Sequence, residues 1–176
     1  MWQDCAVRQF TGESPPDIHP VKGNAWGVSM QPQDGNSYLG LVARASSSWE
    51  SVGQQLSIPL RRGVCYTFNA MLALSETYKG PTRTSYRNGV CELESFAHPV
   101  VFVVWGGQFE CDKMEILAES SDVDNFEWKR YSFILLPHHE YTYITLEAYY
   151  SKSSLKRYNG HIMVDNLSPI IKIDCK

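Results

Sequence analysis

Oxygen-bearing side chains interrupt an apolar run close to the end of the chain. Residues 161–164 favour a strand, yet Asp165 and Asn166 follow directly, and both are poor strand formers that favour turns and ligand sites. Calcium takes about six to eight oxygen ligands, so these two residues are candidate calcium ligands. Asp34, with Asn36 of the same Asp-Gly-Asn turn, is a further candidate. A turn or a cap at the strand end is the competing interpretation.

Recognisable signatures of catalysis are absent from the sequence. It holds no nucleophile elbow of the Gly-x-Ser-x-Gly type, no His-Glu-x-x-His zinc motif, no P-loop and no Gly-x-Gly-x-x-Gly turn. Glycoside hydrolysis needs two carboxyl groups across a cleft, but the pair Glu92 and Glu94 lies in a polar stretch typical of solvated charge. We therefore expect a protein that is not an enzyme.

Aromatic and charged side chains gather where the expected strands end. Aromatic faces pack on the C–H faces of sugar rings, while carboxylates, amides and guanidinium groups bind the hydroxyls. These residues therefore predict a carbohydrate-binding surface, although aromatic residues of a sandwich are also common in its core. The candidate ligand-binding residues are Arg44, Trp49, Glu50, Glu76, Tyr78 and Trp105.

Composition and charge are those of an ordinary globular domain. Hydrophobic residues make up 43% of the 176 residues and charged residues 20%, which fits one domain over residues 1–176. The formal net charge of -3 provides no basic field for phosphates, so we expect no nucleic-acid partner. The longest apolar run, at residues 99–105, has strand length, so we expect no transmembrane segment.

Alternation of period two recurs along the chain, whereas helical periodicity is nearly absent. Tyr66, Phe68, Ala70 and Leu72, for example, alternate with the residues between them. Turn signals such as Asn-Gly, Asp-Gly and Gly-Gly separate such segments. The pattern predicts an all-β fold, an antiparallel β-sandwich of the jelly-roll or Greek-key type. Further expected strands are residues 38–44, 51–58, 100–105, 128–136, 141–148 and 161–165.

At most one short helix is expected. Residues 112–119 could form it, with Met114, Leu117 and Ala118 facing inward. Two long loops, residues 11–25 and 75–98, exceed the usual length of connections in compact domains. Loops of that length are often functional, and a merely decorative surface loop is the alternative.

Five scattered cysteines lack the spacing of zinc or redox sites. Because chain termini often lie close together, we expect a bridge between Cys5 and Cys175, which indicates an oxidising compartment. Cys65 and Cys111 are the other candidate disulfide cysteines, and Cys91 is expected to be left over. Buried free thiols are the alternative.

Motifs along nearly the whole chain resemble a bacterial cell-surface domain. The chain is similar to jelly-roll modules of secreted and outer-membrane proteins of gliding Bacteroidetes, which implies a galactose-binding-like sandwich shared with many carbohydrate-binding modules. The segments that carry the resemblance are residues 2–5, 14–17, 34–42, 49–56, 65–68, 75–78, 105–107, 111–113, 115–120 and 159–170.

The resemblance also implies a structural calcium ion between an early Asn-x-x-Phe-Glu strand and an Asp near the last strand. Asp165 matches the second element. Trp2, near the start of the chain, would follow the first element, so we expect the domain to lack its N-terminal strand. A sheet edge exposed in this way could pair with a partner.

Together these features predict a non-catalytic binding module that is extracellular or on the cell surface, in association with the outer membrane. Its expected ligand is a glycan or a surface polymer. The alternative is a structural or protein-interaction module of an outer-membrane secretion or motility assembly, with a protein partner.

Overall fold

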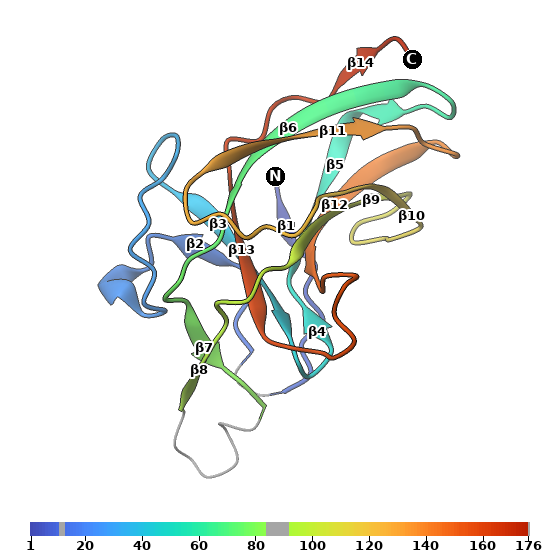
Figure 1. Cartoon of the computed structure of the whole chain (residues 1–176). Helices are drawn as coiled ribbons and strands as arrows, with labels where there is room; N and C mark the ends of the chain where they lie inside the picture. The colour runs from blue at the N-terminus through green and yellow to red at the C-terminus, as the bar shows by residue number, and fades with distance from the viewer. Residues whose placement is uncertain (11–12, 84–91, 176) are drawn as a thin grey trace.

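A computed structural model of the chain describes residues 1–10, 13–83 and 92–175. The prediction of an antiparallel β-sandwich is confirmed, because two antiparallel sheets pack face to face around a common core (Figure 1). The five-stranded sheet has the order β1-β5-β12-β9-β10. Its strands are β1 (Gln3–Asp4), β5 (Ser51–Leu60), β12 (Tyr141–Tyr149), β9 (Val101–Gly107) and β10 (Glu115–Glu119).

The seven-stranded sheet has the order β11-β6-β13-β3-β2, with β14 paired to β6 and β4 paired to β3. Its strands are β11 (Lys129–Leu135), β6 (Cys65–Ala73), β13 (Gly160–Asp165), β3 (Tyr38–Arg44), β2 (Asp17–His19), β14 (Ile171–Ile173) and β4 (Ser48–Trp49). A separate hairpin consists of β7 (Lys79–Pro81) and β8 (Leu93–Ser95).

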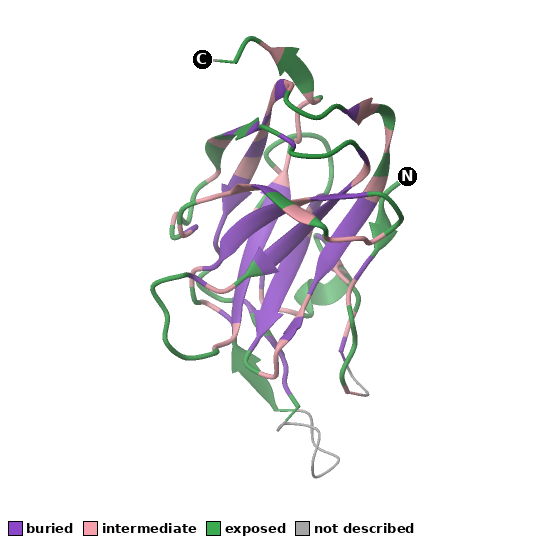
Figure 2. Cartoon of the chain, turned by 90° about the vertical axis from the view of Figure 1, so that its right-hand side faces the viewer, coloured by how far each residue is buried: buried purple, intermediate pink, exposed green. Residues whose placement is uncertain are grey.

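The core lies between the two sheets, as the alternating strands require. Leu41 of β3, Phe68 of β6 and Ile162 of β13 face Phe102 of β9 and Leu146 of β12, and all five are buried. Buried residues fill the strands at the centre of the molecule, and exposed residues lie mainly in the loops around them (Figure 2). This burial of apolar side chains is the main favourable term in folding.

A second, smaller cluster covers the outer face of the seven-stranded sheet. Tyr38 and Val42 of β3 and Met163 of β13 pack there against Tyr78, which lies between β6 and β7, and Phe96, which follows β8. Residues 38–44 and 160–164 are therefore buried on both faces, which explains why they read as nearly continuous apolar runs.

The helix predicted for residues 112–119 is wrong. Residues 115–119 form β10, and within the described residues the one helical element is a short 3-10 turn, η1 (Lys22–Asn24). The pairing of β10 with β9 shifts register between Ile116 and Ala118, so a β-bulge interrupts the alternation. Leu117 is buried there while Ile116 and Met114 are exposed, and this irregular pattern resembled a helical face. None of the helices among the described residues is long and apolar enough to cross a membrane.

The cysteines predicted to form disulfides do so, but with different partners. Cys5 bonds to Cys111, and Cys65 bonds to Cys175, so the predicted Cys5 to Cys175 bridge is wrong. The two ends of the chain belong to different sheets: β1 pairs with β5, whereas β14 pairs with β6, which begins at Cys65. Cys91 lies outside the described residues. Two disulfides are in keeping with an extracellular protein.

Candidate functional site

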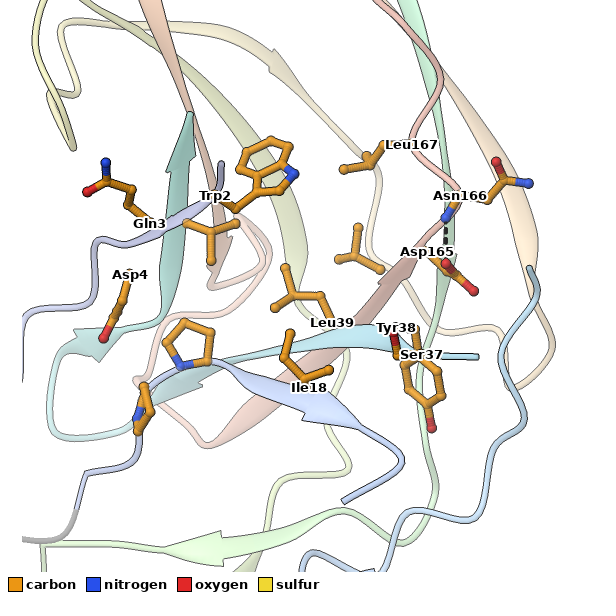
Figure 3. Close-up of a pocket in the computed structure, with 14 residues that line it drawn as sticks. Trp2, Gln3, Asp4, Ile18, Ser37, Tyr38, Leu39, Asp165, Asn166 and Leu167 are labelled. Atoms are coloured by element: carbon orange, nitrogen blue, oxygen red, sulfur yellow. Dashed lines mark hydrogen bonds between the residues drawn. The ribbon is translucent and has the colours of Figure 1, made fainter. Parts of the chain in front are cut away.

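An apolar pocket of about 460 Å³ opens at the edge of the sandwich, between β1 of one sheet and β2 of the other. Its volume lies in the range usual for small-ligand sites, about 300–1,000 Å³. The indole of Trp2, Leu39 and Leu167 point into it from three sides (Figure 3). The lining residues are Trp2, Gln3, Asp4, Pro15, Pro16, Ile18, Ser37, Tyr38, Leu39, Val52, Val164, Asp165, Asn166 and Leu167.

A larger groove of about 1040 Å³, lined by both polar and apolar residues, adjoins this pocket, and Trp2 lines both hollows. We call it the polar groove because its lining is more polar than that of the apolar pocket. Strand β5 runs past both, since Val52 lines the apolar pocket while Gln54 and Leu56 line the polar groove. Strand β1 pairs only with Val52 and Gly53, so among the described residues no further strand of the sheet pairs with this edge of β5 beyond it. We call the apolar pocket and the polar groove together the edge groove.

Each disulfide fixes one segment that lines the edge groove to a neighbouring segment. Cys5 directly follows β1, which Trp2 immediately precedes, and its bond to Cys111 ties that segment to the turn after β9. The bond from Cys65 to Cys175 ties β14, with Lys172, to the start of β6. Covalent ties of this kind reduce the conformational freedom that a ligand would otherwise have to remove.

Asp165 and Asn166 line the apolar pocket and organise the loop that precedes β3. The Asp165 Oδ2 atom accepts hydrogen bonds from the backbone N–H groups of Gln33, at 2.8 Å, and of Asp34, at 3.1 Å. The Asp165 Oδ1 atom accepts from the N–H of Asn166, at 2.7 Å, and the Asn166 side-chain amide donates to Gln33 Oε1, at 2.8 Å. The two residues therefore cap the loop, which is the competing interpretation of their position.

The surroundings of Asp165 do not fit a calcium site by themselves. Calcium needs several oxygen ligands, but both carboxylate oxygens of Asp165 face N–H donors, and Asp34 contributes its backbone N–H. Across residues 1–10, 13–83 and 92–175, no three His, Cys, Asp or Glu side chains gather in a way that could hold a metal ion. A calcium ion at this position would have to be bound by other oxygen atoms.

Adding a chelator is expected to leave the thermal unfolding midpoint of the protein unchanged, because the N–H groups already satisfy Asp165. An ion bound to the native state would stabilise it by mass action, and its removal would lower the midpoint. Differential scanning calorimetry with calcium and with EDTA measures this directly. A lower midpoint in EDTA that calcium restores would show that the site exists.

Three of the predicted ligand-binding residues, Arg44, Glu50 and Tyr78, are buried, and Tyr78 belongs to the outer cluster of the seven-stranded sheet. Arg44 forms an ion pair with Glu50, and Val42 donates its N–H to the other Glu50 oxygen, at 3.1 Å. The Tyr78 hydroxyl donates to Asp17 Oδ2, at 2.6 Å. Glu50 and Tyr78 are so deeply buried that the structure does not support their prediction as direct ligand contacts. Arg44 lines a small hollow of about 240 Å³.

Burial dominates the electrostatics of this cluster. It raises the pKa of Glu50 to about 8, although Arg44 opposes the shift, and it lowers the pKa of His161 to about 4. The His161 ring is stacked on Tyr78 and lies between two backbone partners, accepting from Ser75 and contacting the Phe96 carbonyl. Burial also lowers the pKa of His19. These groups are enclosed by the packing of the sheet face.

The remaining predicted ligand-binding residues lie away from the edge groove. Trp49 is half-buried and stacks on Tyr149, with 5.1 Å between the ring centroids. Trp105 donates its indole N–H to Glu147, at 2.8 Å. Glu76 is exposed in the turn before β7. The structure does not bring these residues together into one site, so their roles stay predictions.

Sequence reasoning missed most of the residues of the edge groove. Trp2 was noted only for its place in a family motif, and Gln54, Tyr66 and Lys172 were not singled out. The groove joins the start of the chain, β5 and the segment after β13, which are far apart in the sequence. The one local signal was the pair Asp165 and Asn166, which does line the apolar pocket.

Comparisons with known proteins show the fold of the chain but no family. No protein-family model and no curated protein sequence matches it. The solved CBM22-1 and GH10 modules of endo-1,4-beta-D-xylanase 10B from Clostridium thermocellum, complexed with xylohexaose, are 15% identical, with a TM-score of 0.50. That match covers 99% of this chain and 26% of that one, so the chain spans about a quarter of the xylanase structure.

Two other solved structures are similar at a lower level. A family 16 carbohydrate-binding module is 11% identical over 84% of this chain and 86% of that chain, with a TM-score of 0.44. The K3 cleaved adhesin domain of Lys-gingipain from Porphyromonas gingivalis W83 is 8% identical over 91% of each chain, with a TM-score of 0.43. At these identities the likenesses concern the fold alone, which is a β-sandwich.

Proposed function

We propose that this chain is a non-catalytic, extracellular module of one domain that binds a glycan or surface polymer in the edge groove. The observation that carries the proposal is the position of Trp2, whose indole lines both hollows and is 40% exposed. A flat aromatic face at the junction of an apolar pocket and a polar groove suits a sugar ring, which presents C–H groups on its faces and hydroxyls around its rim.

Polar side chains that could hydrogen-bond sugar hydroxyls line both hollows of the edge groove. Gln3 and Ser37 line the apolar pocket, and Gln54, Gln55 and Ser168 line the polar groove. Amides and hydroxyls both donate and accept hydrogen bonds, as sugar hydroxyls do. The edge groove therefore offers both apolar contacts and hydrogen-bonding groups along its length, which supports an extended chain as its ligand.

The two carboxylates of the apolar pocket support a binding role over a hydrolytic one. Asp4 accepts hydrogen bonds from the N–H of Ala6, at 2.9 Å, and from Arg8, at 2.7 Å. Both oxygens of Asp165 accept backbone N–H groups. A glycosidase presents one carboxyl group as an acid and the other as a base or nucleophile, whereas these groups are already bound within the protein.

Replacing Trp2 by alanine is expected to lower glycan affinity about tenfold or more, because an aromatic side chain buried by a ligand contributes roughly 1.5–3 kcal/mol. A glycan array, followed by calorimetric titration with the polymer that binds, measures the loss. The matched control is Phe109→Ala, since Phe109 is 73% exposed and lies outside the edge groove. Equal affinity of Trp2→Ala and the wild-type protein would refute the proposal, as would the absence of binding on the array.

A protein-interaction module of an outer-membrane secretion or motility assembly is a second candidate function. Exposed isoleucines favour it, because Ile18 and Ile58 line the edge groove and are 62% and 75% exposed. Exposed apolar groups beside an open strand edge are typical of protein contacts. Under this alternative Ile58→Asp abolishes binding to a cell-surface protein, and no polysaccharide competes for it. Under the glycan proposal, polysaccharide binding depends on Trp2.

A further inference from the structure

Two cations and an aromatic ring meet at the end of the polar groove that lies away from the apolar pocket. Lys172 of β14 pairs directly with Tyr66 of β6, so their side chains point to the same side of the sheet. The Tyr66 hydroxyl accepts a hydrogen bond from the backbone N–H of Arg61, at 2.9 Å. All three residues line the groove, and Arg61 and Lys172 are exposed.

No carboxylate lines this groove among the described residues. The nearest acidic groups of the edge groove are Asp4 and Asp165, which line the apolar pocket beyond Trp2 and are bound there by Arg8 and by backbone N–H groups. Asp174, two residues after Lys172, is not part of the lining. The local charge is therefore positive, although the chain as a whole carries a formal net charge of -3.

We propose that this end of the polar groove binds the anionic group of an acidic glycan, a carboxylate or a sulfate carried on a sugar ring. The inference rests on the proposed function and names its ligand class. Tyr66 packs against the sugar ring, and Arg61 and Lys172 bind the anionic substituent. Arginine matches the planar geometry of a carboxylate or sulfate with two parallel hydrogen bonds, while lysine acts as a point charge.

The disulfide next to this end fixes the position of Lys172 relative to Tyr66. Ile173 of β14 pairs with Cys65, and Cys65 is bonded to Cys175, so Lys172 is held over the start of β6. The strand that carries Lys172 has only three residues, and backbone pairing alone would hold it weakly. A fixed strand keeps the cation opposite Tyr66, which reduces the ordering that binding must impose.

Charge reversal tests the inference. The variants Arg61→Glu and Lys172→Glu are compared with Arg62→Glu, whose side chain is equally exposed in the neighbouring turn but does not line the groove. The probes are polygalacturonate, its fully methyl-esterified neutral form, heparin and xylan, measured by calorimetric titration at low and high salt. Trp2→Ala is measured with every probe.

The inference predicts that at least one acidic probe binds about tenfold more tightly than the neutral polymers, as expected for hydrogen bonds to a charged group. Arg61→Glu and Lys172→Glu then lose this preference, Arg62→Glu keeps it, and added salt weakens binding. Binding that depends on Trp2 but is equal for polygalacturonate and its methyl ester would overturn the acidic ligand and leave the proposed function intact. Absence of binding to every probe would overturn both.

Discussion

Replacing Arg44 by methionine is expected to lower the free energy of unfolding by about 3 kcal/mol at pH 9, where the Glu50 carboxylate is ionised, because it removes one partner of a buried ion pair. Both side chains of the pair are almost completely inaccessible to water. Arg44 compensates Glu50, whose only other hydrogen-bond donor in the described structure is the N–H of Val42. Methionine has a similar length but cannot supply the charge.

The cost of Arg44→Met is expected to depend on pH. Burial raises the pKa of Glu50 to about 8 in the folded protein, above the value of the unfolded chain, and Arg44 keeps it from rising further. The stability that the protonated Glu50 carboxyl group contributes is fully present below the pKa of Glu50 in the unfolded chain. It is lost as the pH rises through the pKa of Glu50 in the folded protein. Without Arg44 the folded pKa is higher still, so above pH 8 the variant loses about 1.4 kcal/mol per pH unit relative to wild type.

Urea unfolding at pH 6, 7 and 9 measures both effects. Arg8→Met is the matched control, because the pair of Arg8 with Asp4 is exposed to solvent and should contribute less than about 1 kcal/mol. The double variant Arg44→Met with Glu50→Leu should recover most of the lost stability, since no buried charge then remains unpaired. Equal costs for Arg44→Met and Arg8→Met would contradict the buried pair.

Removing the bond between Cys5 and Cys111 is expected to lower the free energy of unfolding by about 3–4 kcal/mol, since long closed loops restrict the unfolded chain most. The two cysteines are 106 residues apart. The same change also frees β1, a strand of only two residues that holds Trp2 beside the apolar pocket. We therefore expect weaker glycan binding in Cys5→Ser/Cys111→Ser even at temperatures where the protein stays folded.

The variant Cys65→Ser/Cys175→Ser is the matched comparison for this prediction. Its cysteines are 110 residues apart, so its loss of stability should be similar. It releases β14 rather than β1, so it should weaken the preference for acidic glycans more than the contact with Trp2. Denaturant unfolding and titration of both variants at one temperature separate the effects. Unchanged affinity in a folded Cys5→Ser/Cys111→Ser variant would show that β1 does not form a wall of the site.

The fold was largely predictable because each strand carries its own alternating pattern. Residues 65–73 and 141–149 form strands close to the predicted limits, since inward and outward side chains alternate there with few exceptions. The pattern failed at residues 115–119, where a bulge places Leu117 out of phase. Disulfide partners were not predictable, because they depend on which sheet each end of the chain joins.

The candidate site was less predictable than the fold. Arg44, Glu50 and Tyr78 have the chemistry of sugar-binding residues, but all three are buried in the folded protein. The residue types alone do not tell a buried ion pair from a ligand contact. Trp2 and Lys172 lie at opposite ends of the sequence and line one groove only after both sheets have formed.

The indole N–H signals of the five tryptophans give the most direct test of the edge groove as the glycan site. In nuclear magnetic resonance spectra of the ¹⁵N-labelled protein, each indole gives one signal, and Trp2→Phe identifies that of Trp2. On addition of the polysaccharide selected on the array, the signal of Trp2 should shift while those of Trp49 and Trp105 stay in place. A shift of Trp49 or Trp105 with Trp2 unchanged would contradict the account and place the ligand away from the edge groove.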